Sequence, residues 1–153
     1  MSRASSDPII EEITIDASAE RVFEALVNPE ERVKWWGAEG TFQATHMESD
    51  LRPGGRWRMR GLRINGQPFS ITGEYHEIVR PRLLVFTWLP DWQANASVSL
   101  VRIDLEERDG VTSVRLTHSG LTPEELRMGH RGWPQILAWL RVHIERRETR
   151  PIE

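Results

Sequence analysis

The sequence predicts an α+β domain in which a curved antiparallel sheet wraps around one long C-terminal helix, with two short helices after the first strand. Two observations carry this prediction. From residue 41 to about residue 121, strand-like segments follow one another with short turns, an order typical of an antiparallel meander rather than of alternating β/α units. Apolar residues at helical spacing appear in residues 18–36 and 122–148. The length fits one domain, predicted over residues 9–148 after a flexible tail at residues 1–8.

One strand and two short helices are expected before the meander. Residues 9–15 (IIEEITI) are β-branched and roughly alternating, which predicts a strand. Residues 18–27 place apolar side chains at helical spacing, and Ser18 stands where an N-cap is expected. Asn28 followed by a proline predicts the start of a second helix, which Gly37 ends.

The meander is predicted to contain five or six strands. Asn65-Gly66 and Asp109-Gly110 are dipeptides typical of hairpin turns, and Pro81 interrupts the run between two strands. The predicted strands lie in the segments TFQATHME, GRWRMRGLRI, FSITGEYHEIV, RLLVFTWL, ASVSLVRIDLEE and TSVRLTHSGL.

A long helix is the last predicted element. Thr122 and Glu125 predict a capping box, and Trp133-Pro134 is expected to begin a helix that runs to about Glu148. A helix with one apolar stripe packs that stripe against the sheet. The stripe consists of Trp133, Ile136, Leu137, Leu140 and Ile144.

Four arginines and a tryptophan stand in residues 54–63 (GGRWRMRGLR). Successive side chains of a strand alternate between faces, so we expect Arg56, Arg58 and Arg60 on the solvent face and Trp57 on the core face. Nucleic-acid bases stack on aromatic rings that lie beside the basic groups, and here the aromatic ring points away from them. The chain also carries a net charge of -3. The stretch therefore predicts a solvated sheet face, and no nucleic-acid partner is expected.

The core-facing side chains of the meander predict a cavity between the sheet and the long helix. In a regular strand, Val98 and Leu100 would lie on the opposite face from Val101. We expect a β-bulge near Leu100 that lets all three face the core. Large and amphipathic side chains are favoured for the cavity wall, because tryptophans are rarely buried completely. The expected ligand-binding residues are Trp57, Met59, Ile71, Tyr75, Trp88, Val98, Leu100, His118, Trp133 and Leu137.

The sequence contains no recognisable catalytic or metal-binding motif. It has no cysteine, no HExxH, no phosphate-binding loop and no GxSxG, so no catalytic residue, metal or cofactor is assigned. His46 and Glu48 lie on one predicted strand and could contact a metal, but a pair of surface residues is the favoured interpretation. His118 is the titratable group that we expect in the cavity. It is interpreted as a hydrogen-bonded core histidine or, alternatively, as a general base beside Glu39 or Glu77.

Several segments resemble the START-like (SRPBCC) superfamily and, more narrowly, the heat-shock protein 90 ATPase activator homologue family. They are ASAERVFEALVNPEERVKWWG, DLRPGGRWRMR, GEYHEIVRPRLLVFTW, TSVRLTHSGL and GWPQILAWL, in that order across about residues 9–147. The resemblance implies a helix-grip fold with an internal pocket. It implies no single activity, because relatives include ligand carriers, polyketide cyclases and resistance proteins that sequester a toxin.

The expected function is the binding of a hydrophobic or aromatic small molecule in the cavity, without catalysis. Two alternatives stay open: a cyclase- or hydrolase-like enzyme that uses the cavity histidine, and an interaction module associated with a chaperone. No apolar run is long enough for a signal peptide or a membrane span. A cytoplasmic location without a membrane partner is therefore expected, and assembly into a homodimer is compatible with the sequence.

Overall fold

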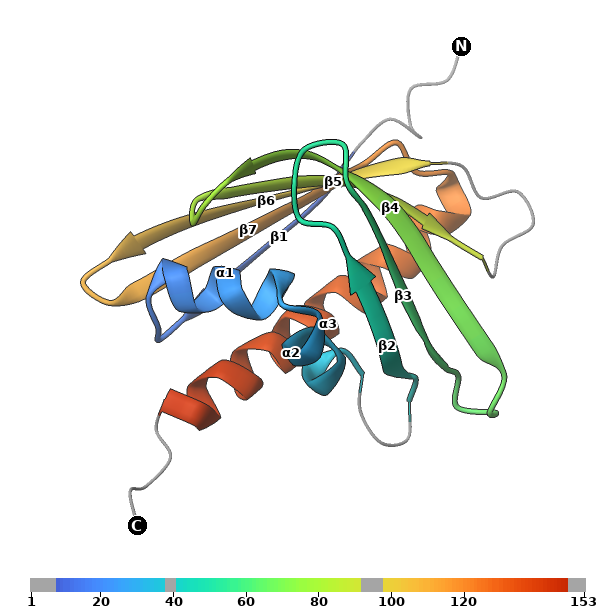
Figure 1. Ribbon diagram of the computed structural model, residues 1–153, viewed down its shortest axis with the longest axis horizontal. Helices are drawn as coiled ribbons and strands as arrows, with labels where there is room; N and C mark the ends of the chain where they lie inside the picture. Colours follow the sequence, from blue (N-terminus) through green and yellow to red (C-terminus); the bar gives the residue numbers. More distant parts are fainter. Residues whose placement is uncertain (1–7, 38–40, 92–97, 149–153) are drawn as a thin grey trace.

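The computed structural model describes residues 8–37, 41–91 and 98–148. Within these residues, seven strands form one antiparallel sheet in the order β1-β7-β6-β5-β4-β3-β2. Figure 1 shows this sheet curving over α3, with α1 and α2 beside that helix. The predicted α+β class, with its two short helices and one long helix, is confirmed. The elements are β1 (Ile9–Ile15), α1 (Ala19–Val27), α2 (Pro29–Trp35), β2 (Gln43–Ser49), β3 (Arg56–Leu62), β4 (Pro68–Val79), β5 (Leu83–Pro90), β6 (Ser99–Arg108), β7 (Val111–Ser119) and α3 (Pro123–Glu148).

The two short helices begin at the predicted caps. Ser18 Oγ accepts a hydrogen bond from the backbone N–H of Arg21, at 3.1 Å. Asn28 Oδ1 accepts from the N–H groups of Glu30 and Glu31, at 3.0 and 3.3 Å. These side chains satisfy N–H groups that have no partner within their own helix, so the short elements have defined starts.

Helix α3 begins earlier than expected. The N–H of Glu125 donates to Thr122 Oγ1 at 3.2 Å, and the N–H of Thr122 donates to Glu125 Oε1 at 2.9 Å, which confirms the capping box. The helix then runs without interruption through Pro134, so Trp133-Pro134 does not begin a new helix. A proline removes the hydrogen bond to the carbonyl four residues earlier, that of His130. Both residues are exposed, and water can therefore satisfy that carbonyl.

Strand β3 alternates between solvent and core as predicted. Arg56, Arg58 and Arg60 are exposed, whereas Trp57 and Met59 are buried. The arginines therefore lie on the outer face of the sheet, and the tryptophan contributes to the core.

Two irregularities interrupt the pairing of the sheet, and neither is the predicted one. The register shifts between Ala44 and His46 in β2, and between Tyr75 and Glu77 in β4. Strand β6 pairs with β5 and β7 without a shift, so the bulge expected near Leu100 is wrong. The odd-numbered residues of β6 face the core over its first seven positions.

The core lies between the concave face of the sheet and the helices. Leu140 and Ile144 of α3 are fully buried, and Trp133, Ile136 and Leu137 are nearly so. The predicted apolar stripe is therefore the packing face of the helix. Among the described residues, no helix combines the length and apolar character that crossing a membrane requires.

Candidate ligand-binding site

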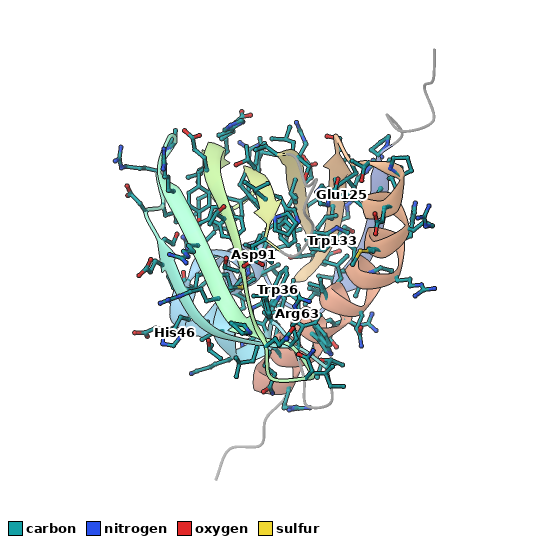
Figure 2. The ribbon with its side chains drawn as sticks, turned by 90° about the vertical axis from the view of Figure 1, so that its right-hand side faces the viewer. Trp36, His46, Arg63, Asp91, Glu125 and Trp133 are labelled. Atoms are coloured by element: carbon teal, nitrogen blue, oxygen red, sulfur yellow. The ribbon has the colours of Figure 1, made fainter. Side chains whose placement is uncertain are left out.

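A pocket of about 530 Å³ is lined by residues of the sheet, of α3 and of the segment after α2. In Figure 2, Trp36 and Trp133 lie between the sheet and α3, with Glu125 toward one end and Arg63 toward the other. The volume lies within the range of about 300–1,000 Å³ that is typical of small-molecule sites. Most of its wall is apolar, and the large side chains on it are Trp36, Phe42, Phe69, Ile71, Trp88 and Trp133.

Three tryptophans from different parts of the chain meet on the pocket wall. Trp88 comes from β5, Trp133 from α3, and Trp36 directly follows α2. The ring centroids are 5.2 Å apart for Trp88 and Trp133, 5.9 Å for Trp36 and Trp88, and 6.0 Å for Trp36 and Trp133. These separations are typical of favourable aromatic pairs. Because each ring packs against the other two, the wall is held in place before any ligand arrives.

Helix α3 presents two glycines to the pocket. Glu125, Gly129, Gly132 and Ile136 line it and follow one another at helical spacing. A Cβ atom at Gly132 would meet nothing within 4 Å, whereas a Cβ at Gly129 would collide with the end of the Ile9 side chain. The missing side chain at Gly132 therefore leaves open space beside the helix.

His118 lies on the pocket wall at the centre of a hydrogen-bonded chain. Its Nδ1 accepts from the indole N–H of Trp133 at 2.9 Å, and its Nε2 lies 2.8 Å from Ser99 Oγ. Ser99 Oγ in turn donates to the carbonyl of Trp88 at 3.2 Å. An indole nitrogen only donates, so Nδ1 carries no proton and Nε2–H is the donor to Ser99. Each polar side-chain atom of Trp133, His118 and Ser99 thus has a hydrogen-bond partner.

This geometry gives His118 a structural role. Burial lowers the pKa of its imidazole to about 4, so the ring is neutral at neutral pH. Both ring nitrogens are engaged, which leaves no lone pair free to take a proton from a bound molecule. In the described part of the chain no hydrogen bond or ion pair joins Glu77 to His118, and Glu77 is exposed. Glu39, the other acid considered, lies outside the described residues.

The structure brings together only part of the predicted cavity set. On the pocket wall lie Ile71, Trp88, His118 and Trp133. Four others are buried in the core without lining the pocket, namely Trp57, Met59, Tyr75 and Leu137. That any of these residues binds a ligand stays a prediction.

The structure contradicts the inward placement of Val98 and Leu100. Val98 is 59% exposed, and Leu100 is only partly buried. The regular register of β6 places Ser99 and Val101 inside instead. A polar residue is tolerated at the inner position because His118 and the carbonyl of Trp88 satisfy the Ser99 hydroxyl.

Sequence reasoning missed several pocket residues, among them Trp36, Phe42, Phe69, Glu125 and Gly132. Most of them belong to segments that come together only through the curvature of the sheet. The two glycines of α3, in contrast, can be recognised in the sequence. A glycine inside a helix costs about 0.5–1 kcal/mol relative to alanine, and two of them three residues apart in RMGHRGW indicate a face that needs room.

No metal centre is formed by the residues that the structure describes, because no three of their histidine, aspartate and glutamate side chains cluster around a common point. His46, the metal candidate of the sequence, is exposed on β2, and its Nδ1 lies 3.1 Å from Thr45 Oγ1.

A curved antiparallel sheet that grips a C-terminal helix beside an apolar pocket defines a START-like (SRPBCC) protein. The chain belongs to the family described as Activator of Hsp90 ATPase homolog 1-like protein, whose model matches residues 16–145, and the resemblance seen in the sequence is confirmed. No curated protein matches the chain significantly.

Solved bacterial structures share this fold. Protein CV1439 from Chromobacterium violaceum is 26% identical with a TM-score of 0.79, over 91% of this chain and 97% of that chain. Protein NE0264 from Nitrosomonas europaea is 20% identical with a TM-score of 0.80, over 97% and 99%. Protein Ms6760 from Mycobacterium smegmatis is 19% identical with a TM-score of 0.81, over 97% and 94%. The last two likenesses show the fold alone.

Proposed function

We propose that this protein binds a hydrophobic or aromatic small molecule in the pocket beside α3, without performing chemistry on it. The observation that carries the proposal is the apolar pocket of about 530 Å³ with three mutually packed tryptophans on its wall. Polar side chains are few and include Arg63, Glu125 and Gln135. One or two such groups are enough to orient a ligand.

A flat aromatic ligand suits this wall. Offset stacking on an indole contributes about 0.5–1.5 kcal/mol per pair beyond the burial of area, and Trp36, Trp88 and Trp133 all offer indole surface on the pocket wall. Catalysis is the less favoured alternative, because His118 has both ring nitrogens engaged. A ligand carrier needs no such group.

Intrinsic tryptophan fluorescence tests the proposal. We expect a panel of naphthalene-based fluorophores and aromatic compounds to quench the emission saturably, because three tryptophans line the pocket. Trp88→Ala should weaken the response. Since Trp88 also packs in the core, the folding of this variant is to be checked by circular dichroism.

A second variant blocks the pocket without disturbing the core. Gly132→Leu places a side chain into open space, and a leucine is a good helix former. We expect it to fold normally and to lose at least about tenfold in affinity, the loss that 1.4 kcal/mol represents. Val142→Leu, at an exposed position of the same helix outside the pocket, is the matched control. Unchanged binding by Gly132→Leu, or no binding by the wild type, would contradict the proposal.

A further inference from the structure

Arg32 is a buried cation to which none of the described residues offers an anionic partner. It comes from α2 and is only 5% exposed, and among the described residues it makes one hydrogen bond, from Nη1 to the carbonyl of Leu26 at 2.9 Å. Its Nε is buried and has no acceptor. No carboxylate among the described residues interacts with it. The guanidinium instead stacks on Trp36, with Cζ 4.6 Å from the ring centroid.

A second buried donor without an acceptor lies beside this cation. The indole Nε1 of Trp57, on β3, is also buried without a partner, although the side chain is only 3% exposed. Arg32 Cζ lies 5.8 Å from the Trp57 ring centroid, so the two residues are neighbours. By contrast, the indole of Trp35 on the same helix donates to the carbonyl of Ala25 at 2.9 Å.

An acceptor with negative charge would satisfy both buried donors and would balance the buried positive charge. Burial lowers the pKa of Arg32 to about 10, so the guanidinium remains charged at neutral pH. Buried charges in proteins are normally paired, and buried donors normally find acceptors. The indole faces around Arg32 attract a cation, but they accept no conventional hydrogen bond from its Nε. A water molecule would accept a hydrogen bond but would leave the charge unbalanced.

We propose that Arg32 and Trp57 form a buried binding site for a small monovalent inorganic anion of halide size. The anion accepts hydrogen bonds from Arg32 Nε and Trp57 Nε1 and balances the guanidinium charge. Neither residue lines the 530 Å³ pocket, whereas Trp36 lines the pocket and also stacks on Arg32. The two donors are therefore separate from the proposed ligand pocket, and because both donor atoms are buried, a small ion is favoured over an organic acid.

Thermal unfolding in sodium bromide tests this site, with sodium gluconate holding the ionic strength constant. Gluconate is too large for an enclosed site, so we expect bromide alone to raise the melting temperature, and to do so saturably, as a ligand of the native state does. Trp57→Phe keeps a ring but removes the N–H, and it should weaken the apparent bromide affinity about tenfold or more. Arg32→Gln should abolish the response. Arg58→Gln, an exposed arginine on β3, is the control and should retain it.

The outcomes are decisive in both directions. If Arg32→Gln does not fold, the bromide response of Trp57→Phe alone decides. Crystals grown in bromide should show an anomalous peak within hydrogen-bond distance of both Arg32 Nε and Trp57 Nε1. An equal melting temperature in bromide and gluconate, an undiminished response in Trp57→Phe, or a water at this place would overturn the proposal. None of these results depends on whether the pocket binds an aromatic ligand.

Discussion

The indole nitrogen of Trp133 donates to Nδ1 of His118 across 2.9 Å, which joins α3 to the inner face of β7. This one hydrogen bond fixes the tautomer of the imidazole and the position of an indole on the pocket wall. Protonation of Nδ1 would place two N–H groups against each other. The neutral imidazole is thus favoured by its partner as well as by its burial, and the pocket wall depends on a ring that must stay uncharged.

The stability of the fold should therefore fall in mild acid. The pKa of His118 is about 4 in the folded protein against an ordinary value of 6.5. As the pH falls below 6.5, the unfolded chain binds the proton before the folded one does, so stability is full above 6.5 and is lost progressively down to about 4. The loss from this residue is about 3 kcal/mol, at 1.36 kcal/mol per pKa unit. Urea unfolding at several pH values between 7.5 and 4 measures it.

His118→Gln separates this contribution from that of the carboxylates, which also titrate in acid. Glutamine fills similar space without titrating in this range. The variant should show a flatter dependence of the unfolding free energy on pH between 6.5 and 4, whatever its stability at pH 7.5. Identical slopes for the variant and the wild type would show that His118 titrates normally in the folded protein.

The two glycines of α3 should respond to alanine in opposite directions. At Gly132 the added Cβ meets open space, so the gain in helix propensity should raise the free energy of unfolding by about 0.5–1 kcal/mol. At Gly129 the Cβ collides with the fully buried Ile9, and overpacking of a core costs about 1–3 kcal/mol. Urea denaturation of the pair at pH 7.5 checks both signs. A stabilised Gly129→Ala would mean that Ile9 has room to move.

Local rules were enough to predict most of the fold. The caps at Ser18 and Asn28 and the alternation along β3 depend on neighbouring residues alone, and the structure has them as predicted. The inward placement of Val98 and Leu100 is wrong because apolar character alone does not determine which face of a strand points inward. Register with the neighbouring strands determined the faces of β6 instead.

The pocket was harder to predict than the core. Trp57 and Tyr75 were expected on its wall, but both pack in the interior, where Tyr75 Oη lies 2.7 Å from Ser49 Oγ. Core residues and pocket-lining residues both lie on the inward face of a strand, at every second position. The alternation along a strand therefore does not distinguish one kind of residue from the other. The position of the pocket depends on where α3 lies along the sheet, and the glycines at 129 and 132 were the local sign of that position.

The outer face of β3 should be dispensable for small-molecule binding. Arg56 lies opposite Glu74, and Arg58 lies opposite Glu48 on the sheet surface. Exposed ion pairs contribute only about 0–1 kcal/mol each. Replacing Arg56, Arg58 and Arg60 together by alanine should leave ligand titrations unchanged and the melting temperature nearly so. Fluorescence anisotropy with labelled RNA and DNA completes the test: tight, salt-dependent binding by the wild type that the triple variant loses would reverse this interpretation of the arginines.

Leu140 should be among the costly positions of α3. Its side chain is fully buried between the helix and the sheet, so Leu140→Ala removes apolar contacts and leaves a cavity. Such substitutions cost about 2–5 kcal/mol, because the surroundings relax only partly. Val142→Ala, at an exposed position two residues further along, is the matched control and should change the unfolding free energy by less than about 0.5 kcal/mol. Urea denaturation of both variants measures the difference, and equal small effects would show that the apolar stripe of α3 does not anchor the helix to the sheet.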